Sequence, residues 1–488
     1  MLIPFTPPPG LNSDDSSFLA SGAWVDGSNV RFWNGSAETV GGVAQIVNLA
    51  TILSATYTDL FAFSRAGAPT FAYGATSGEL LVGSINAPVN RSPVIGTVTG
   101  GYSFAAWGDV LLGAARGETL YQQSGTDIAV AVLNAPHRID AGILVTPERQ
   151  VIAFGCNEEV SGEFNPMCIR GSDIEDYTDW TTSAANNAFE YIIEGSGAII
   201  AAMQVGPHIA VWTTSSLYIG QFIGDPAQTY RFDKVADVPG PVTVRSATTL
   251  NGSAWWMGRD NRLRVWVPGS LPQSIPCPIF RDFNEAAIDP ASQIFSFITT
   301  NRSYEEVWYF YYDSRSPGSR TTRYVAYSIR ESRDTGRPVW FRGILSRSAM
   351  LDSELVRAVS IGNNSGILGV DEESIALRHD DPASSLPAYI VSGDQYIDNG
   401  QHRFMIRGVI PDFSSQGAGV YLTVNVRDYP QGTATESGPH FLNVSPFETT
   451  KKDFRASGRI FSCRFERDSP GQWRIGKFLL DVVPLGER

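Results

Sequence analysis

The chain has 488 residues, of which 43% are hydrophobic and 18% charged, so it is long enough for two or three domains and can bury a substantial core. This composition excludes an intrinsically disordered polypeptide. Its 37 basic and 50 acidic residues give a net charge of −13, which argues against a protein that grips nucleic acid by neutralising phosphates.

Residues 1–22 are predicted to form an extended N-terminal arm, because four prolines favour extended backbone and "NSDDSS" is polar turn sequence. The N-terminus lacks the basic and apolar regions of a secretory signal. No stretch approaches the roughly 18 apolar residues of a membrane span. We therefore expect an arm that either dangles or lies on a neighbour, in a protein assembled in a cytoplasm.

Residues 23–380 are predicted to form a β-propeller-like domain. From Val43 to Arg378, short β-branched or aromatic runs alternate with turns rich in Gly, Asn, Asp and Ser, which is typical of hairpins. Strand repeats of roughly 40–50 residues suggest about six or seven propeller blades. A pair of β-sandwiches is the structural alternative. The best helix candidate is short, around Asn284 to Phe295.

Residues 381–488 are predicted to form a small antiparallel β-sandwich domain. A polar, proline-containing linker, "RHDDPASSLPAYI", precedes four alternating strands. In one of them, Tyr421, Thr423 and Asn425 alternate with apolar residues, so one face is expected to point inward and one outward.

Metal, cofactor and catalytic motifs are absent from the sequence, so no such site is predicted. The five histidines are scattered, and no nucleophile elbow, phosphate-binding loop or dinucleotide fingerprint is present. Four cysteines without C-x-x-C spacing are expected to be buried free thiols: Cys156, Cys168, Cys277 and Cys463.

The densest acidic cluster is "GSDIEDYTDW". Propeller folds can house glycosidases with paired carboxyl groups, so Asp173, Glu175 or Asp176 could act on a glycan with Trp180 as a sugar platform. The competing interpretation is a solvated loop between blades. The repeated turns of sialidase propellers are missing, which weakens the case for an enzyme.

Arginines gather in two predicted hairpins, where such side chains usually meet carboxylates of a neighbouring surface. We therefore predict an interface role rather than specific DNA readout for Arg259, Arg262 and Arg264, with Arg315, Arg320 and Arg323 in the second hairpin. The aromatic run Tyr309–Asp313 is predicted to pack in the core.

Several phrases together resemble, in order, the tail hub or nozzle proteins of tailed bacteriophages, with the packaged-DNA stabilisation proteins of short-tailed phages as the nearest comparison. The resemblance runs from Trp24 to Arg488, and the N-terminal arm departs from it. None of the phrases is a catalytic signature. They are "WVDGSNVRFWNGSAETVGG", "IRGSDIEDYTDW", "IAVWTTSSLYIGQFIGDP", "AWWMGRDNRLRVW", "IPCPIFRDFNEA" and "GQWRIGKFLLDVVPLGER".

The resemblance implies a structural virion protein rather than an enzyme. Such a subunit forms a homohexameric ring below the portal and the head-to-tail adaptor, contacts tail needle, plug or fibre proteins, and continues the channel through which DNA leaves. An acidic channel wall would offer passing DNA no phosphate-binding sites. One alternative is a carbohydrate-active propeller, with the acidic cluster described above as its site, or a receptor-binding propeller of the tail. Another is a host-surface adhesin, which the missing secretion signal disfavours.

The stretch "VRFWNG" is predicted to be a strand closed by an Asn34-Gly35 type I′ turn. It places Val30 and Phe32 on one face and Arg31 and Trp33 on the other. We expect it to complete the first blade or to latch onto the ring, with Asp26 and Arg31 available to form ion pairs. A plain core strand is the alternative.

Overall fold

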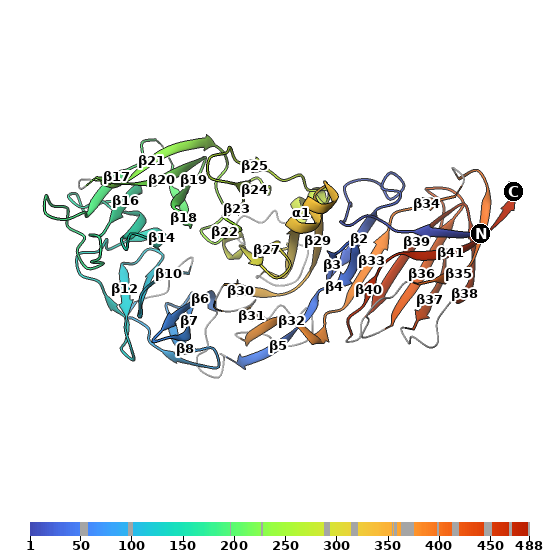
Figure 1. Ribbon diagram of the computed structural model, residues 1–488, viewed down its shortest axis with the longest axis horizontal. Helices are drawn as coiled ribbons and strands as arrows, with labels where there is room; N and C mark the ends of the chain where they lie inside the picture. Colours follow the sequence, from blue (N-terminus) through green and yellow to red (C-terminus); the bar gives the residue numbers. More distant parts are fainter. Residues whose placement is uncertain are drawn as a thin grey trace.

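The computed structural model describes residues 1–48, 57–95, 101–195, 197–225, 228–286, 293–313, 321–353, 355, 359–362, 375–397, 400–411, 419–443, 451–467 and 471–486. Within these residues the chain is almost entirely antiparallel β-structure, with seven four-stranded sheets arranged around a ring and a β-sandwich beside them (Figure 1). The predicted all-β fold, a propeller-like domain followed by a small antiparallel sandwich, is confirmed.

The first four blades follow one another along the chain, each from the axis outward. Blade 1 comprises β6 (Tyr57–Arg65), β7 (Ala68–Ala75), β8 (Leu80–Ser84) and β9 (Ala87–Asn90). Blade 2 comprises β10 (Tyr102–Trp107), β11 (Val110–Ala115), β12 (Leu120–Gln123) and β13 (Val130–Ala131). Blade 3 comprises β14 (Ile139–Val145), β15 (Val151–Asn157), β16 (Phe164–Gly171) and β17 (Phe189–Ile192). Blade 4 comprises β18 (Ile199–Val205), β19 (His208–Thr213), β20 (Ser216–Asp225) and β21 (Gln228–Asp237).

The remaining blades carry the helical elements between or beside them. Blade 5 comprises β22 (Ala247–Leu250), β23 (Ser253–Met257), β24 (Leu263–Trp266) and β25 (Gln273–Ser274). Helix α1 (Phe280–Ala286) and the 3-10 turn η2 (Gln293–Phe295) follow it. Blade 6 comprises β26 (Phe297–Asn301), β27 (Glu306–Tyr311), β28 (Arg323–Ser328) and β29 (Val339–Ile344), with helix α2 (Ile329–Thr335) between the last two strands.

Blade 7 closes the ring with a strand from the other end of the sequence. It comprises β30 (Arg347–Leu351), β31 (Val359–Gly362), β32 (Ile375–Ser385) and β5 (Gly41–Asn48). The outermost strand, β5, pairs antiparallel with β32, so that Gly41 lies opposite Ser385 and Asn48 opposite Ile375. Because blade 7 joins strands separated by about 300 residues of sequence, the ring is held shut by backbone hydrogen bonds.

Hydrophobic side chains fill the spaces between neighbouring blades. One such cluster joins blades 4 and 5, where the rings of Trp212 and Trp256 lie 5.4 Å apart. In blade 6, all six residues of β27 are buried, which confirms the predicted core packing of Tyr309 and its neighbours. A four-stranded sheet exposes two apolar faces, and stacking on both neighbours removes each from water.

Two further sheets form the sandwich. One has the order β1 (Leu2–Phe5), β41 (Phe478–Gly486), β35 (Arg403–Ile410) and β38 (Lys452–Gly458). The other has the order β2 (Trp24–Ser28), β33 (Ala388–Ser392), β39 (Ile460–Arg467), β36 (Val420–Arg427) and β37 (Thr435–Leu442), with β34 (Gln395–Tyr396) also on β39. A small sheet joins β3 (Val30–Trp33), β4 (Ser36–Thr39) and β40 (Arg474–Ile475).

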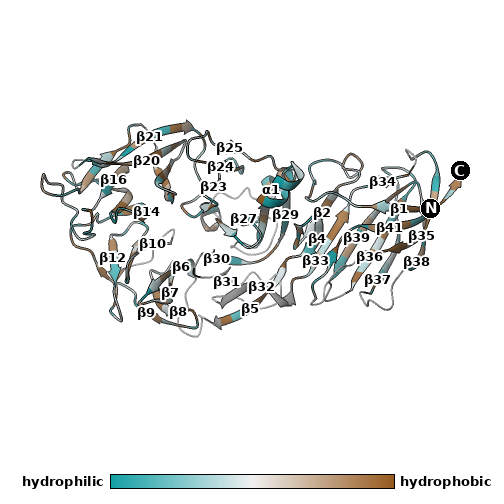
Figure 2. Ribbon diagram, in the orientation of Figure 1, coloured by the Kyte–Doolittle hydropathy of each residue, from teal (hydrophilic) through white to brown (hydrophobic). Residues whose placement is uncertain are grey.

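Alternation along the sandwich strands follows the sequence prediction. In β36, Val420, Leu422, Val424 and Val426 are buried and Tyr421 is exposed, although Thr423 is also largely covered. Figure 2 shows hydrophobic and hydrophilic residues alternating along these strands, whereas α1 is mostly hydrophilic.

The N-terminal residues pack into the sandwich and against the propeller instead of forming a separate arm. Strand β1 pairs with β41, and Phe5 is buried against Phe478 with a ring separation of 4.8 Å. Residues 24–39, which the sequence assigned to the propeller, pair with strands of the sandwich. Their partners lie hundreds of residues away, which local sequence patterns do not reveal.

The helical elements also differ from the prediction. Helix α1 begins and ends earlier than the expected segment and overlaps it at residues 284–286. The expected segment also contains the short turn η2, and residues 287–292 lie outside the described residues. Helix α2 was not predicted. Its sequence nevertheless has a capping signature, because the Ser328 hydroxyl accepts a hydrogen bond from the backbone of Glu331 and Gly336 ends the helix with a φ of 69°.

Candidate functional site

The stretch "VRFWNG" folds into the predicted hairpin. Strands β3 and β4 pair with Trp33 opposite Ser36, and the two turn residues Asn34 and Gly35 have φ angles of 49° and 73°. Both angles are positive, as a type I′ turn requires. The hairpin completes no blade of the described propeller, which corrects that part of the hypothesis: β4 pairs with β40 beside the sandwich.

Arg31 forms a buried ion pair with blade 6. Its Nε lies 3.3 Å from Oε1 of Glu306, and the two side chains are 1% and 0% exposed. The guanidinium also lies over the ring of Tyr304, 3.6 Å from its centroid, and Oε2 of Glu306 accepts a hydrogen bond from the Trp308 indole at 2.8 Å. Burying two charges is costly, so this geometry fixes the hairpin against β27 only while both partners are present.

The tip of the hairpin is held by helix α2. The Glu331 carboxylate accepts hydrogen bonds from the backbone N–H groups of Asn34 at 2.6 Å and Gly35 at 3.1 Å. Next to it, the Arg330 guanidinium lies 4.0 Å from the ring centroid of Trp33. Trp33 therefore packs within the chain, where it joins the hairpin to blade 6.

Asp26 is paired with blade 6 as well. Its Oδ1 accepts a hydrogen bond from Nη2 of Arg342 at 2.8 Å, and Arg342 also binds Asp282 at the start of α1. The Tyr389 hydroxyl of β33 donates to Asp26 Oδ2 at 3.2 Å. Asp26 and Arg31 thus have separate partners, and each connects an N-terminal strand to the propeller.

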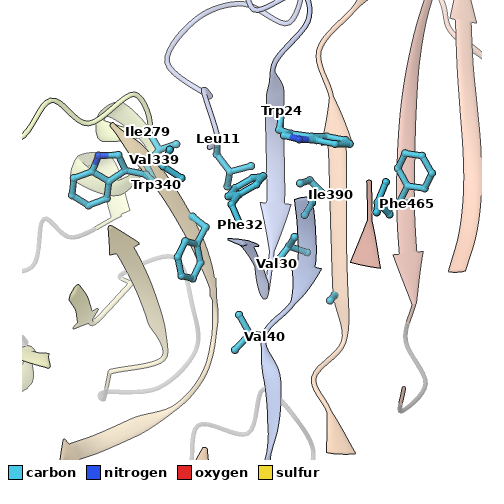
Figure 3. Close-up of a cluster of buried hydrophobic side chains, with 14 of the residues drawn as sticks. Leu11, Trp24, Val30, Phe32, Val40, Ile279, Val339, Trp340, Ile390 and Phe465 are labelled. Carbon is cyan, nitrogen blue, oxygen red and sulfur yellow. The ribbon is translucent and has the colours of Figure 1, made fainter. Parts of the chain in front are cut away.

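These contacts form what we call the N-terminal joint, residues 24–39 with their partners on blade 6 and on the sandwich. Figure 3 shows its apolar part, in which the N-terminal strands lie between β29 and the sandwich strands. Its labelled side chains include Val339 and Trp340 from β29, Leu11, Trp24, Val30 and Phe32 from the N-terminal segment, and Ile390 and Phe465 from the sandwich. One continuous core therefore runs from blade 6 into the sandwich.

The partners of the joint could not be identified from sequence. Glu306, Glu331 and Arg342 lie about 270–310 residues from the hairpin, and no motif links them. The capping signature Ser328 to Glu331 could have revealed helix α2, but not that its glutamate would bind the hairpin tip.

The three arginines of the β23–β24 turn differ in their surroundings. Arg264 is buried and makes a bidentate ion pair with Asp260, with contacts of 2.7 and 2.6 Å. Arg262 is exposed and lies over the Phe280 ring of α1, whereas Arg259 is exposed with no side-chain partner among the described residues. In the second hairpin, Arg323 pairs with Asp313 at 2.7 Å, and Arg315 and Arg320 lie outside the described residues.

The acidic cluster of blade 3 is built as turn structure. Asp173 accepts hydrogen bonds from the backbone of Ile174 and Asn187, and Glu175 pairs with Arg149 at 3.0 Å. Hydrogen bonds from Thr178 lower the pKa of the Asp176 carboxyl and so favour its ionised form, whereas a general acid has to be protonated.

Trp180 is not a sugar platform. Its side chain is 0% exposed, packs in the core between blades 2 and 3, and donates its indole N–H to the Tyr177 carbonyl at 2.8 Å. A buried ring offers no face on which a sugar can stack, so this part of the glycan hypothesis is wrong.

A second buried charge pair occupies the axis of the propeller. Arg245, just before β22, donates to the carbonyls of Phe295 at 2.7 Å and Ser348 at 3.2 Å, and its Nη1 lies 3.9 Å from Asp59 Oδ1 in blade 1. Burial raises the pKa of Asp59, while Arg245 opposes that rise. Cavities of about 140 and 220 Å³ are both lined by Arg245 and Tyr102, so this arginine ties blades 1, 5, 6 and 7 across the axis.

Among the described residues no group of three or more His, Cys, Asp or Glu side chains is placed to hold a metal ion. Cys156, Cys168 and Cys463 are buried free thiols as predicted, and Cys277 is half-buried. Within the same part of the chain, no helix is long and apolar enough to cross a membrane.

Sequence comparison finds no matching protein family and no matching curated protein. The designed protein Ika8 matches at 14% identity and a TM-score of 0.38, over 69% of this chain and 99% of that chain. BBS1N in complex with ARL6DN matches at 10% identity and a TM-score of 0.40, over 70% of this chain and 96% of that chain. BamB from Moraxella catarrhalis matches at 10% identity and a TM-score of 0.35, over 69% of this chain and 97% of that chain. Likeness at this level identifies no function for the chain.

Proposed function

We propose that this protein is a structural virion protein, a tail nozzle or hub subunit of a short-tailed bacteriophage. Copies form a ring of six below the portal and the head-to-tail adaptor. The ring extends the DNA ejection channel, helps to retain packaged DNA, and carries needle, plug or fibre proteins at its far end. The assembly takes place in the host cytoplasm and the protein resides in the virion tail.

Residues 24–42, the first segment that resembles the nozzle proteins, support this proposal because their charged side chains form ion pairs within the chain. Within it, Asp26, Arg31 and Glu38 each have an ion-pair partner in the same chain. A ligand-binding surface would leave such groups available, whereas here Asp26 and Arg31 fasten the N-terminal strands to blade 6 and Glu38 fastens β4 to β40. A part that transmits load between a head and a tail needs this kind of rigid connection.

The axis of the propeller has no room for a DNA channel. Arg245 crosses it, and the two cavities beside it, of about 140 and 220 Å³, have room for only a few water molecules. DNA would therefore pass between copies of the chain, along a wall formed by the ring. The net charge of −13 would keep that wall from binding phosphates.

The mass of the purified protein tests the proposal, measured alone and with adaptor-bound portal by native mass spectrometry. We expect a ring of about six copies on the portal complex. A persistent monomer or trimer without affinity for that complex would count against a nozzle. Clearing of host polysaccharide by the same sample would favour the carbohydrate-active alternative.

A further inference from the structure

The negative charge of the chain is concentrated in blade 3. Residues 139–195 contain eleven Asp and Glu residues against two arginines, so this blade carries nine of the thirteen net negative charges. Three of the glutamates lie in the turn between β15 and β16, which we call the acidic turn: Glu158, Glu159 and Glu163.

The acidic turn has no cationic partner among the described residues. The two arginines of the blade are engaged elsewhere, Arg149 with Glu175 and Arg170 with the Trp180 carbonyl. Glu158 accepts hydrogen bonds from Ser161 and Asn165, which keep it ionised. Val160, between the carboxylates, is 97% exposed. Like charges held around an exposed apolar residue repel one another until a cationic surface covers them.

Blade 5 presents the opposite charge. Residues 247–274 contain three arginines and one aspartate, Asp260, which binds Arg264 through both oxygens and has Oδ2 3.9 Å from Nε of Arg262. Arg259 and Arg262 remain exposed in the turn between β23 and β24, which we call the basic turn. This blade also carries an exposed apolar residue, Leu271, which is 68% exposed.

The two turns lie at the same end of the propeller. Each connects the second strand of its blade to the third, and the blades have the same strand order outward from the axis. A rotation axis parallel to the propeller axis keeps such turns level. The acidic turn of one copy would therefore meet the basic turn of the next at equal height.

The directions of the two blades also suit a closed ring. Blades 3 and 5 are two steps apart in the order of seven; blade 3 lies on the side of the propeller away from the sandwich, and blade 5 lies next to α1 (Figure 1). Seen from the propeller axis, two blades that are two steps apart in a ring of seven are separated by roughly 103°. In a ring of five or six subunits, the two neighbours of a subunit lie in directions about 108° or 120° apart, which is similar.

We propose that the acidic turn of blade 3 docks against the basic turn of blade 5 in a second copy of this chain. The contact is heterologous, because two different surfaces of the chain meet, and this is the kind of contact that closes rings. The inference rests on the proposed ring and assigns its lateral interface. Complementary charge at that interface makes association depend on ionic strength.

Charge exchange tests this interface. One variant carries Glu158→Lys and Glu159→Lys, another carries Arg259→Glu and Arg262→Glu, and a third combines all four changes. Native mass spectrometry with and without adaptor-bound portal measures ring formation. We expect each two-site variant to weaken self-association by about tenfold or more. An equimolar mixture of the two, and the four-site variant, should recover it, because each restores opposite charges across the contact.

Matched reversals of exposed charges on the sandwich, Glu436→Lys and Arg455→Glu, serve as controls and should leave ring formation unchanged. Equal thermal unfolding midpoints would show that all variants fold. A ring that forms equally well with either two-site variant would overturn this interface while leaving the proposed function standing. A wild-type chain that forms no ring, alone or on the portal, would instead overturn the proposed function and this interface with it.

Discussion

Arg31 and Glu306 are buried together where water solvates neither charge. Replacing Arg31 with Met removes this ion-pair partner of a buried carboxylate, so we expect a loss of about 3–5 kcal/mol in the free energy of unfolding. Urea denaturation followed by tryptophan fluorescence measures it. Arg231→Met, in an exposed pair with Asp233, is the matched control and should cost about 1 kcal/mol or less. Similar losses in both variants would show that burial does not set the strength of the Arg31 pair.

Asp481, which lies near the N-terminal ammonium, is expected to make the stability of the protein depend on pH in the acid range. Hydrogen bonds from Lys451 and Arg407 lower the pKa of its carboxyl to about 2, and the N-terminal ammonium lies 3.9 Å away. A depressed pKa contributes stability that is present above the unfolded value of about 3.9 and is lost as the pH falls towards 2.

Asp481→Asn should therefore flatten the dependence of unfolding free energy on pH between about 4 and 2, and lower stability at neutral pH. Denaturant titrations at several pH values check this expectation. Asp453→Asn, at an exposed carboxylate that also contacts Lys451, is the comparison. If the slope for Asp481→Asn equals that of the wild type, other carboxyl groups account for the acid sensitivity.

Strand β5 is the element on which closure of the propeller depends. It supplies the outermost strand of blade 7 from residues that precede blade 1. Replacing residues 43–48 with a Gly/Ser sequence of equal length removes strand propensity at six positions, at roughly 0.5–1 kcal/mol each. We expect a loss of roughly 3–6 kcal/mol in the free energy of unfolding.

Calorimetry and limited proteolysis measure the effect of that replacement. The same substitution at residues 181–186, in the exposed loop between β16 and β17, is the control and should cost about 1 kcal/mol or less. An unchanged unfolding midpoint in the β5 variant would mean that the blades hold together without this closing strand.

The same element shows what the sequence could and could not predict. Short β-branched runs between turn residues predicted the hairpins, because strand formation and the Asn34-Gly35 turn depend on neighbouring residues. The pairing of β5 with β32 depends on which edges remain free after the other blades have formed. Nothing within β5 itself encodes that partner.

The candidate site follows the same division. The sequence selected Asp26, Arg31 and Trp33, and the structure places all three in the N-terminal joint. Their partners, Glu306 and Arg342, depend on tertiary contacts. Trp180 was misinterpreted because an indole after an acidic run has the same sequence pattern whether it faces a ligand or the core.

At the scale of the whole molecule, residues 1–40 complete the sandwich from the opposite end of the chain. They supply β1 and β2 at the edges of its two sheets, and β3 and β4 next to β40. The fragment 381–488 alone would expose the core residues Phe478 and Ile390. We therefore expect it to lack near-ultraviolet circular dichroism and a cooperative thermal transition.

Joining residues 1–40 to the end of that fragment should restore folding. The Met1 nitrogen donates a hydrogen bond to the Val482 carbonyl at 2.8 Å, so the ends lie close together, and a Gly/Ser linker of about ten residues spans the remaining distance. The same fusion with Phe5→Ala and Trp24→Ala should stay unfolded, since each large-to-small change costs about 3–5 kcal/mol in a core. Cooperative folding of 381–488 without residues 1–40 would show that the sandwich is an independent domain and that the joint merely attaches it.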